Sequence, residues 1–236
     1  MRGRSVILKA VQELWVCDLG VVSYEEADAL QRRLCEARKA DAVADVLLLL
    51  EHPPVYTRGR RTSDAELPFG AGFYATRGID VVEVDRGGRA TYHGPGQLVG
   101  YPIMRIGDIV GYLRTVEGAL IAALERHGVA ARGGGERPTG VWVGERKIAS
   151  IGVHVSRRVT THGFAVNVDG DLEPFEWIVP CGLSGVRMTS LEREDGRDLE
   201  GFRASVAEEF ALAFERRARR VEPAALEAAG DAAVAG

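Results

Sequence analysis

The chain has 236 residues, 46% of them hydrophobic and 27% charged, which provides enough apolar material for a folded core and excludes disorder over its whole length. Thirty basic against 34 acidic residues give a net charge of -4, without the positive field on which non-specific nucleic-acid binding relies. No apolar stretch approaches the roughly 20 residues of a membrane-spanning helix, and the start of the chain lacks the long apolar region of a signal peptide. We therefore expect a cytoplasmic protein that binds neither nucleic acid nor membrane.

The first part of the chain predicts a helix between two strands. Residues 11 to 22 favour a short strand and a turn, after which Ser23 is placed to cap a helix with acidic residues in its first turn. The apolar run from 45 to 51, ended by two prolines, is typical of a buried strand. Residues 57 to 78, rich in Arg and Gly, predict a long loop.

Further strands and two long helices follow. Alternating or continuous apolar residues predict strands at 79–85, 98–104, 140–143, 147–155 and 163–168. Apolar residues spaced three or four apart predict helices over 108–127 and 198–220. Beyond residue 222 the chain is Ala-rich and has few side chains that could anchor it.

The succession of these elements predicts one domain. No linker rich in Ser or Pro and no repeat divides the chain, so we expect a single domain over 1–220 and a frayed tail over 221–236. Hairpin-like runs of strands with singly inserted helices favour an α/β domain of the α+β type, in which helices flank a mixed sheet.

The cysteines are too few and too scattered for a disulfide framework or a zinc site, and we expect no metal. Cys17 and Cys35 fall in the first predicted strand and helix, where core packing is expected. Cys181 stands instead between Pro180 and Gly182 in a predicted turn. Such a position suits a nucleophile that a bulky substrate must reach, whereas the alternative is a small packing residue in a loop.

The segment from Arg86 to Tyr101 holds the densest set of candidate binding groups. Five glycines, two arginines, two tyrosines, a histidine and a glutamine occur within sixteen residues. Glycines let the backbone approach a ligand, and the polar side chains can hold a carbonyl or a phosphate. The alternative is an irregular turn with a buried, hydrogen-bonded His93. The segment matches neither the phosphate-binding P-loop nor the dinucleotide-binding fingerprint.

Lysine is rare in this chain, since only Lys9, Lys39 and Lys147 are lysines among the 30 basic residues. A lysine in such a background can be retained because, unlike arginine, it can lose a proton near neutral pH. Lys147 begins a predicted strand whose same face carries Ala149, Ile151 and two valines. It either extends to solvent or is partly desolvated, and near Cys181 it would favour the thiolate.

Together these motifs resemble the lipoyl (octanoyl) transferases. The run Arg-Gly-Gly-x-x-Thr-Tyr-His-x-x-Gly-Gln-x-x-x-Tyr, complete from Arg86 to Tyr101, is similar to that family's signature. The similarity covers about residues 12 to 215 and includes further matching blocks at 48–56, 147–152, 162–167 and 178–182.

The resemblance implies the α/β fold of biotin and lipoate protein ligases and assigns roles to individual residues. Cys181 would carry the acyl group as a thioester, and Lys147 would lower the pKa of that thiol and shuttle protons. The acyl and pantetheine site would be lined by Arg86, Gly87, Gly88, Arg89, Ala90, Thr91, Tyr92, His93, Ser150, Ile151, Gly152, Gly163, Phe164 and Ala165.

The resemblance also implies a reaction and its partners. An octanoyl group would pass from octanoyl-acyl carrier protein to a lysine of lipoyl domains, in 2-oxoacid dehydrogenase complexes and in the glycine cleavage H protein. Because the donor is already a thioester and the product is a more stable amide, neither ATP nor another cofactor is expected.

Two alternatives stay open from the sequence. An ATP-dependent lipoate or biotin ligase of the same fold would form an acyl-adenylate and would not need a nucleophilic cysteine. A non-catalytic carrier-binding protein would keep the fold alone, although the presence of both Cys181 and Lys147 argues against it.

Overall fold

The computed structural model describes residues 11–135, 137–179 and 186–234. Their helices are α1 (Tyr24–Lys39), α2 (Gly70–Ala75), α3 (Ile109–Arg126), α4 (Phe202–Ala213) and α5 (Pro223–Val234). Their strands are β1 (Glu13–Val21), β2 (Asp45–Glu51), β3 (Val55–Arg58), β4 (Asp80–Glu83), β5 (Thr91–His93), β6 (Gln97–Ile103), β7 (Arg132–Gly133), β8 (Gly140–Val143), β9 (Arg146–Ser156), β10 (Val159–Asn167), β11 (Arg187–Met188) and β12 (Arg217–Arg220).

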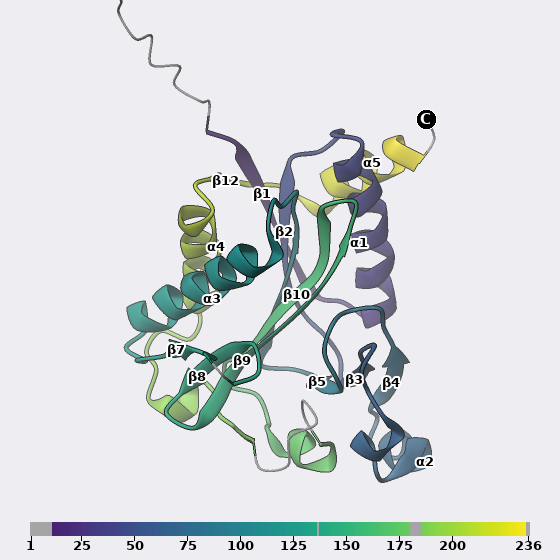
Figure 1. The fold of residues 1–236 in the computed structure, drawn as a ribbon, viewed down its shortest axis with the longest axis vertical. Coiled ribbons are helices and arrows are strands. Elements are labelled where there is room, and N and C mark those ends of the chain that lie inside the picture. The colour runs from purple at the N-terminus through teal and green to yellow at the C-terminus, as the bar shows by residue number, and fades with distance from the viewer. Residues whose placement is uncertain (1–10, 136, 180–185, 235–236) are drawn as a thin grey trace, which may run out of the picture.

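Within the described ranges the strands form two sheets. The larger is nine-stranded and mixed, in the order β12-β1-β2-β6-β10-β9-β8-β7, with β11 pairing beside β9. The smaller has the order β4-β3-β5. Helices α1 and α5 cover one face of the large sheet, and α3 and α4 cover the other (Figure 1). The predicted α/β domain with a mixed sheet flanked by helices is confirmed.

The strand β2 shows how the sequence matches a sheet that is covered by helices on both faces. Successive side chains of a strand point to opposite faces. Leu47 and Leu49 therefore pack with the helices α3 and α4, whereas Leu48 and Leu50 pack with α1. The run is apolar throughout because both of its faces are covered.

Two helices begin where the sequence predicts. Ser23 and Glu26 form a reciprocal capping box at the start of α1, and the side chain of Asp108 accepts hydrogen bonds from the backbone amides of Val110 and Gly111 at the start of α3. None of the helices in the described part is long and apolar enough to cross a membrane.

Two predicted elements are wrong, the loop over 57–78 and the length of the helix over 198–220. The segment 57–78 is not a continuous loop, because it contains the end of β3, a 3-10 turn at Asp64–Glu66 and the helix α2. The helix predicted over 198–220 is α4, which ends at Ala213, and Glu215 then adopts a left-handed backbone conformation with φ of 53°. That conformation stops a helix, and the following residues pair as β12 in parallel with β1.

The frayed tail expected over 221–236 is also wrong for most of its length. The helix α5 lies along α1, and its Leu226 is fully buried in the cluster that contains Leu34 and Cys35 (Figure 1). The helix α5 is ordered because it packs on the apolar outer face of α1. This contact is long-range in sequence, so no local pattern predicts it.

A buried carboxylate joins segments that are far apart in the sequence. Asp45, at the start of β2, is 3% exposed and accepts hydrogen bonds from Arg38 Nε at 2.8 Å, Arg216 Nε at 3.1 Å and the backbone amide of Arg105 at 3.1 Å. It therefore connects α1, the end of β6 and the chain between α4 and β12.

Candidate active site

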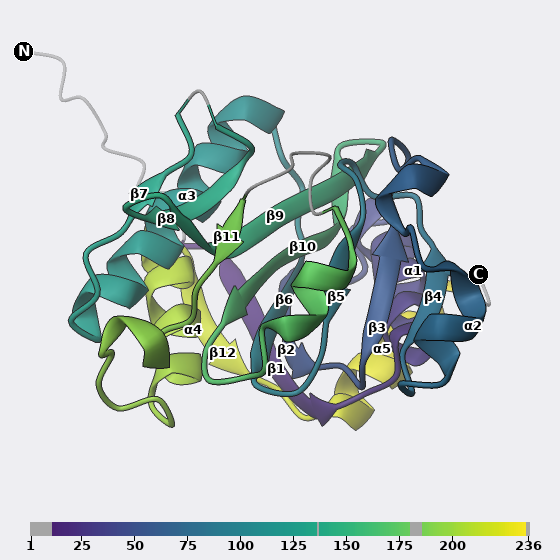
Figure 2. The same cartoon turned by 90° about the horizontal axis from the view of Figure 1, so that it is seen from below.

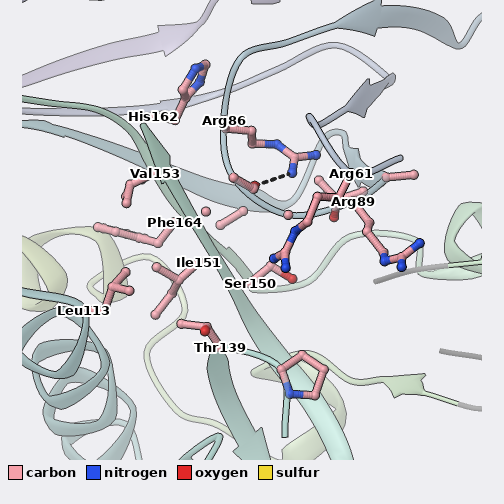
Figure 3. Close-up of a pocket in the computed structure, with 18 of the residues that line it drawn as sticks. Arg61, Arg86, Arg89, Leu113, Thr139, Ser150, Ile151, Val153, His162 and Phe164 are labelled. Carbon is pink, nitrogen blue, oxygen red and sulfur yellow. Dashed lines mark hydrogen bonds between the residues drawn. The ribbon is translucent and has the colours of Figure 1, made fainter. Parts of the chain in front are cut away.

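A cavity of about 710 Å³ opens above the strands β9 and β10, between α3 and the small sheet. It brings together four segments that the sequence analysis singled out separately. The predicted residues that line it are Arg86, Gly87, Gly88, Arg89, Ala90, Thr91, His93, Lys147, Ser150, Ile151, Gly152, Gly163, Phe164 and Ala165. Figure 3 shows several of these side chains around β9.

The loop that begins at Arg86 lies directly on β9. The amide of Gly87 donates to the carbonyl of Val153 at 3.0 Å, and a Cβ on Gly152 would come within 3.0 Å of the Gly87 carbonyl. Glycine at 152 therefore permits the close contact. The buried guanidinium of Arg86 donates to the hydroxyl and the carbonyl of Thr57 and to the carbonyl of Gly87, which fixes the loop against β3.

Tyr92 is the exception among the predicted binding residues, because it does not line the cavity. Side chains alternate along β5, so that Thr91 and His93 face the cavity while Tyr92 faces the other way. Its ring packs at 5.5 Å, between ring centres, from both Tyr56 and Phe175. Tyr92 therefore belongs to the core beneath the small sheet.

The side of the cavity next to α3 is apolar. Leu113 from α3, Ile151 and Val153 from β9 and Phe164 from β10 lie around it (Figure 3). Phe164 fits because β6 has a glycine opposite, at Gly100, where any Cβ would overlap the aromatic ring. This part of the cavity can hold an aliphatic chain.

Lys147 lines the same cavity and is 2% exposed, so that it is buried rather than extended to solvent. Its Nζ lies 5.7 Å from the centre of the Trp142 ring. Gly140 adopts a φ of 147°, and a Cβ there would come within 2.7 Å of Lys147 Cε. The amide of Gly140 donates to the buried carboxylate of Glu117 on α3 at 3.2 Å. The lysine is thus enclosed by β8 and held in a defined place.

Cys181, the predicted nucleophile, lies outside the described residues. The other cysteines pack in the core as predicted, since Cys17 and Cys35 are buried in the cluster beneath α1. Burial raises the pKa of the Cys17 thiol to about 11 and also raises that of Cys35. Both thiols are protonated at neutral pH, as expected of cysteines that serve packing.

Buried histidines and tyrosines form a further wall that the sequence analysis did not assign. His162 Nε2–H donates to Asp85 at 2.6 Å, which leaves Nδ1 as the acceptor for the Tyr24 hydroxyl at 3.3 Å. The Tyr101 hydroxyl donates to His52 Nε2 at 2.7 Å. These contacts join residues more than 40 positions apart, so no local spacing could reveal them.

His93 is held by a hydrogen-bond chain of its own. Its Nδ1–H donates to Gln97 Oε1 at 2.6 Å, and Gln97 Nε2 donates to Asn167 Oδ1 at 2.9 Å. Asn167 Nδ2 in turn donates to the carbonyl of Thr189 at 2.9 Å. The ring of His93 is therefore buried and hydrogen-bonded, as the alternative expected, but it lies on the strand β5 rather than in an irregular turn, and it also forms part of the cavity wall.

Acidification should destabilise the protein through these histidines. Burial lowers the pKa of His93 from 6.5 to about 3, and that of His52 and His162 is lowered as well. Between pH 6.5 and 3 the unfolded chain binds a proton at His93 that the folded protein does not. The free energy of unfolding should therefore fall by about 2 kcal/mol from His93 alone between pH 6.5 and pH 5.

Urea titrations at a series of pH values measure this effect. The variant His93→Gln should have a correspondingly shallower pH dependence, whereas His154→Gln, at a partly exposed position, serves as the matched control. An unchanged slope in His93→Gln would contradict the assignment of a neutral buried ring.

The remaining lining residues were not among the predicted site residues, although Tyr101 ends the signature segment and His162 begins a matching block. They are Tyr24, Arg61, Tyr101, Ile109, Leu113, Arg137, Pro138, Thr139, Val153, Val155 and His162. Arg61, Arg86 and Arg89 give the side of the cavity away from α3 a cationic character (Figure 3). Among the described residues, no three His, Cys, Asp or Glu side chains are grouped so that they could hold a metal ion.

Comparison with known proteins places the chain in a family. Octanoyltransferases from Acidothermus cellulolyticus and Mycobacterium ulcerans are 52% and 50% identical to the chain. Their alignments cover 76% and 82% of it, and 81% and 85% of the relatives. A structure of a bi-partite lipoate protein ligase from Thermoplasma acidophilum, 18% identical, has the same fold, with a TM-score of 0.74 over 94% of this chain and 91% of that one. Residues 23–211 match the lipoyl protein ligase A/B catalytic domain. The chain belongs to this family, among its octanoyltransferases.

Proposed function

We propose that this protein transfers an octanoyl group from octanoyl-acyl carrier protein to a lysine of lipoyl domains, through a thioester on Cys181. Its family membership makes it an acyltransferase. The observation that carries the proposal is the buried Lys147 in a cavity that is apolar toward α3 and is otherwise lined by the signature residues. A proton-transferring amine beside an aliphatic binding site is what acyl transfer between thiol and amine requires.

In the first step the Cys181 thiolate attacks the carbonyl carbon of the octanoyl thioester. The tetrahedral oxyanion forms, and the bond to the carrier sulfur breaks as it collapses. Lys147, as the ammonium, gives its proton to the departing carrier thiolate. The products are the Cys181 octanoyl thioester, the free carrier thiol and neutral Lys147, so atoms and charge balance.

In the second step the neutral amine of the acceptor lysine attacks the Cys181 thioester. Lys147 takes the proton that the attacking nitrogen loses, and the Cys181 thiolate leaves. The enzyme returns to its starting state, an ion pair of thiolate and ammonium. Because an amide is more stable than a thioester, the reaction needs no nucleotide.

The apolar side of the cavity supplies binding energy for the octanoyl chain. Leu113, Ile151 and Phe164 present aliphatic and aromatic carbon there. Each buried CH₂ contributes about 0.8 kcal/mol, so the chain can anchor the donor while the carbonyl is held near Lys147. The acceptors proposed are the lipoyl domains of 2-oxoacid dehydrogenase complexes and the glycine cleavage H protein, in the cytoplasm.

Intact-mass measurement tests the covalent step. The purified protein is incubated with octanoyl-acyl carrier protein without ATP and should gain one octanoyl group that hydroxylamine removes. Cys181→Ser should gain none, because an alkoxide is not available near neutral pH. The double variant Cys17→Ala, Cys35→Ala is the control and should acquire the group as the wild type does, since both side chains lie in the core.

Two results would contradict the proposal. An adduct that survives in Cys181→Ser would place the thioester elsewhere. A folded protein that forms no adduct, but makes octanoyl-adenylate when ATP is added, would be an ATP-dependent ligase.

A further inference from the structure

One arginine in the cavity wall, Arg61, makes no polar side-chain contact that would stabilise the fold of the described residues. Each of the other arginines there is held by a neighbour: Arg86 by Thr57, Arg89 by Glu66 and Arg137 by Glu145. Arg61 makes no side-chain hydrogen bond or ion pair with any residue that the structure describes. Its guanidinium therefore retains its five donors for a ligand.

The backbone at Arg61 is held against the signature loop, while its side chain is exposed. The amide of Arg60 donates to the carbonyl of Arg86 at 3.2 Å, and that of Arg61 donates to the carbonyl of Gly88 at 3.1 Å. A Cβ at Gly59 would come within 2.7 Å of the Gly88 carbonyl, so the turn is packed tightly against the signature loop. The backbone of Arg61 is thus anchored to the same loop that forms the cavity wall, and its exposed guanidinium lines the cavity from that loop.

Charge identifies the part of the reaction that Arg61 can serve. The octanoyl chain is uncharged, and the side chain of an acceptor lysine is a cation, which arginine repels. The donor brings a negative charge into the cavity, because acyl groups are carried on phosphopantetheine, whose phosphodiester lies at the far end of the arm from the thioester. Arg61 lies away from the apolar side where Leu113 and Ile151 meet (Figure 3).

We propose that Arg61 binds the phosphodiester of the phosphopantetheine arm and so selects the carrier-bound donor. This inference rests on the proposed function. A planar guanidinium can donate two parallel hydrogen bonds to a phosphate, and such charge-assisted bonds are about twice as strong as neutral ones.

Two small donors that differ only in the phosphate, together with the carrier-bound donor, test the proposal. The value of kcat/KM is measured with octanoyl-4′-phosphopantetheine, with octanoyl-pantetheine and with octanoyl-acyl carrier protein. The wild type should prefer the phosphorylated small donor over the other small donor by about 10- to 100-fold. In Arg61→Gln this ratio should fall to about 1, and kcat/KM for the carrier protein should fall by a similar factor, mainly through KM.

Arg60→Gln is the matched control. It removes the same charge from the neighbouring position, but Arg60 contacts His154 at 3.2 Å and does not line the cavity. The control should retain the wild-type ratio between the two small donors. A general effect of positive charge on the rim would reduce the ratio in both variants and would overturn the assignment to Arg61.

Other outcomes also decide the matter. If Arg61→Gln slows all three donors equally, or only the carrier protein, Arg61 does not bind the phosphodiester. If the wild type works but does not distinguish the two small donors, this inference alone fails. If the wild type acylates a lipoyl domain from none of the three donors, the proposed function fails as well.

Discussion

Replacing Lys147 by arginine should lower the rate of octanoyl transfer by about 10²- to 10⁴-fold, the range that positioned proton transfer contributes to catalysis. Arginine keeps the positive charge, but a guanidinium does not give up a proton in proteins. It could therefore neither protonate the carrier thiolate nor accept the proton of the acceptor amine. Single-turnover measurements of amide formation, with mass spectrometry of the acyl-enzyme, separate the two steps.

The described part of the chain offers a matched control in Lys39. Its ammonium pairs with Glu36 at 2.8 Å on α1 and does not line the cavity, so Lys39→Arg should transfer octanoyl at close to the wild-type rate. Because Lys147 is enclosed, circular dichroism and thermal unfolding must establish that Lys147→Arg folds. The smaller variant Lys147→Met, which fits the site without charge, should be similarly slow. Near-normal turnover in a folded Lys147→Arg would contradict the proton-shuttle role.

Replacing Asp45 by asparagine should lower the free energy of unfolding by about 3 kcal/mol, because it leaves Arg216 without its counter-charge and removes the buried one of the two carboxylates that pair with Arg38. Arg38 and Arg216 both donate to this carboxylate, and their side chains are largely buried. Urea unfolding followed by circular dichroism measures the loss. Catalysis should survive in the folded fraction, since Asp45 does not line the cavity.

Asp41→Asn separates the effect of burial from that of charge. Asp41 also pairs with Arg38 and with Arg105, but its side chain is 70% exposed. Ion pairs at exposed positions contribute at most about 1 kcal/mol, so this variant should lose far less stability than Asp45→Asn. If the two variants lost the same free energy of unfolding, the burial of Asp45 would not increase its contribution to stability.

The strongly periodic segments could be predicted from the sequence because their stability is local or follows from burial on both faces. The helix α3 and the strand β2 begin and end within a residue of the predicted bounds, and α1 begins directly after its predicted cap, Ser23. By contrast, β12 and α5 exist through pairing with β1 and packing on α1, which lie about 200 positions away. The alanine- and arginine-rich sequence of that region does not indicate that it pairs with β1 or packs on α1.

The residues of the candidate site likewise fall into those that could be predicted from the sequence and those that could not. The signature loop was identified because its glycines and polar groups are unusual in sequence, and the blocks at 150–152 and 163–165 were assigned through the family resemblance alone. The structure collects all three around one cavity. Leu113 was visible only as part of an apolar helix stripe, since periodicity shows which face is buried but not against what. Tyr24 and His162 join the wall through tertiary contacts alone. Alternation along β5 does explain why Tyr92 turns away.

The strand β12 has a further consequence, for association between molecules. It forms one edge of the large sheet, its residues are exposed, and three of its four side chains are arginines. Open edges are the places where sheets of different molecules join and aggregate. A second copy approaching edge to edge would set arginine against arginine, while the opposite edge, β7, is only two residues long. The arginines of β12 thus disfavour the growth of a continuous intermolecular sheet from this edge.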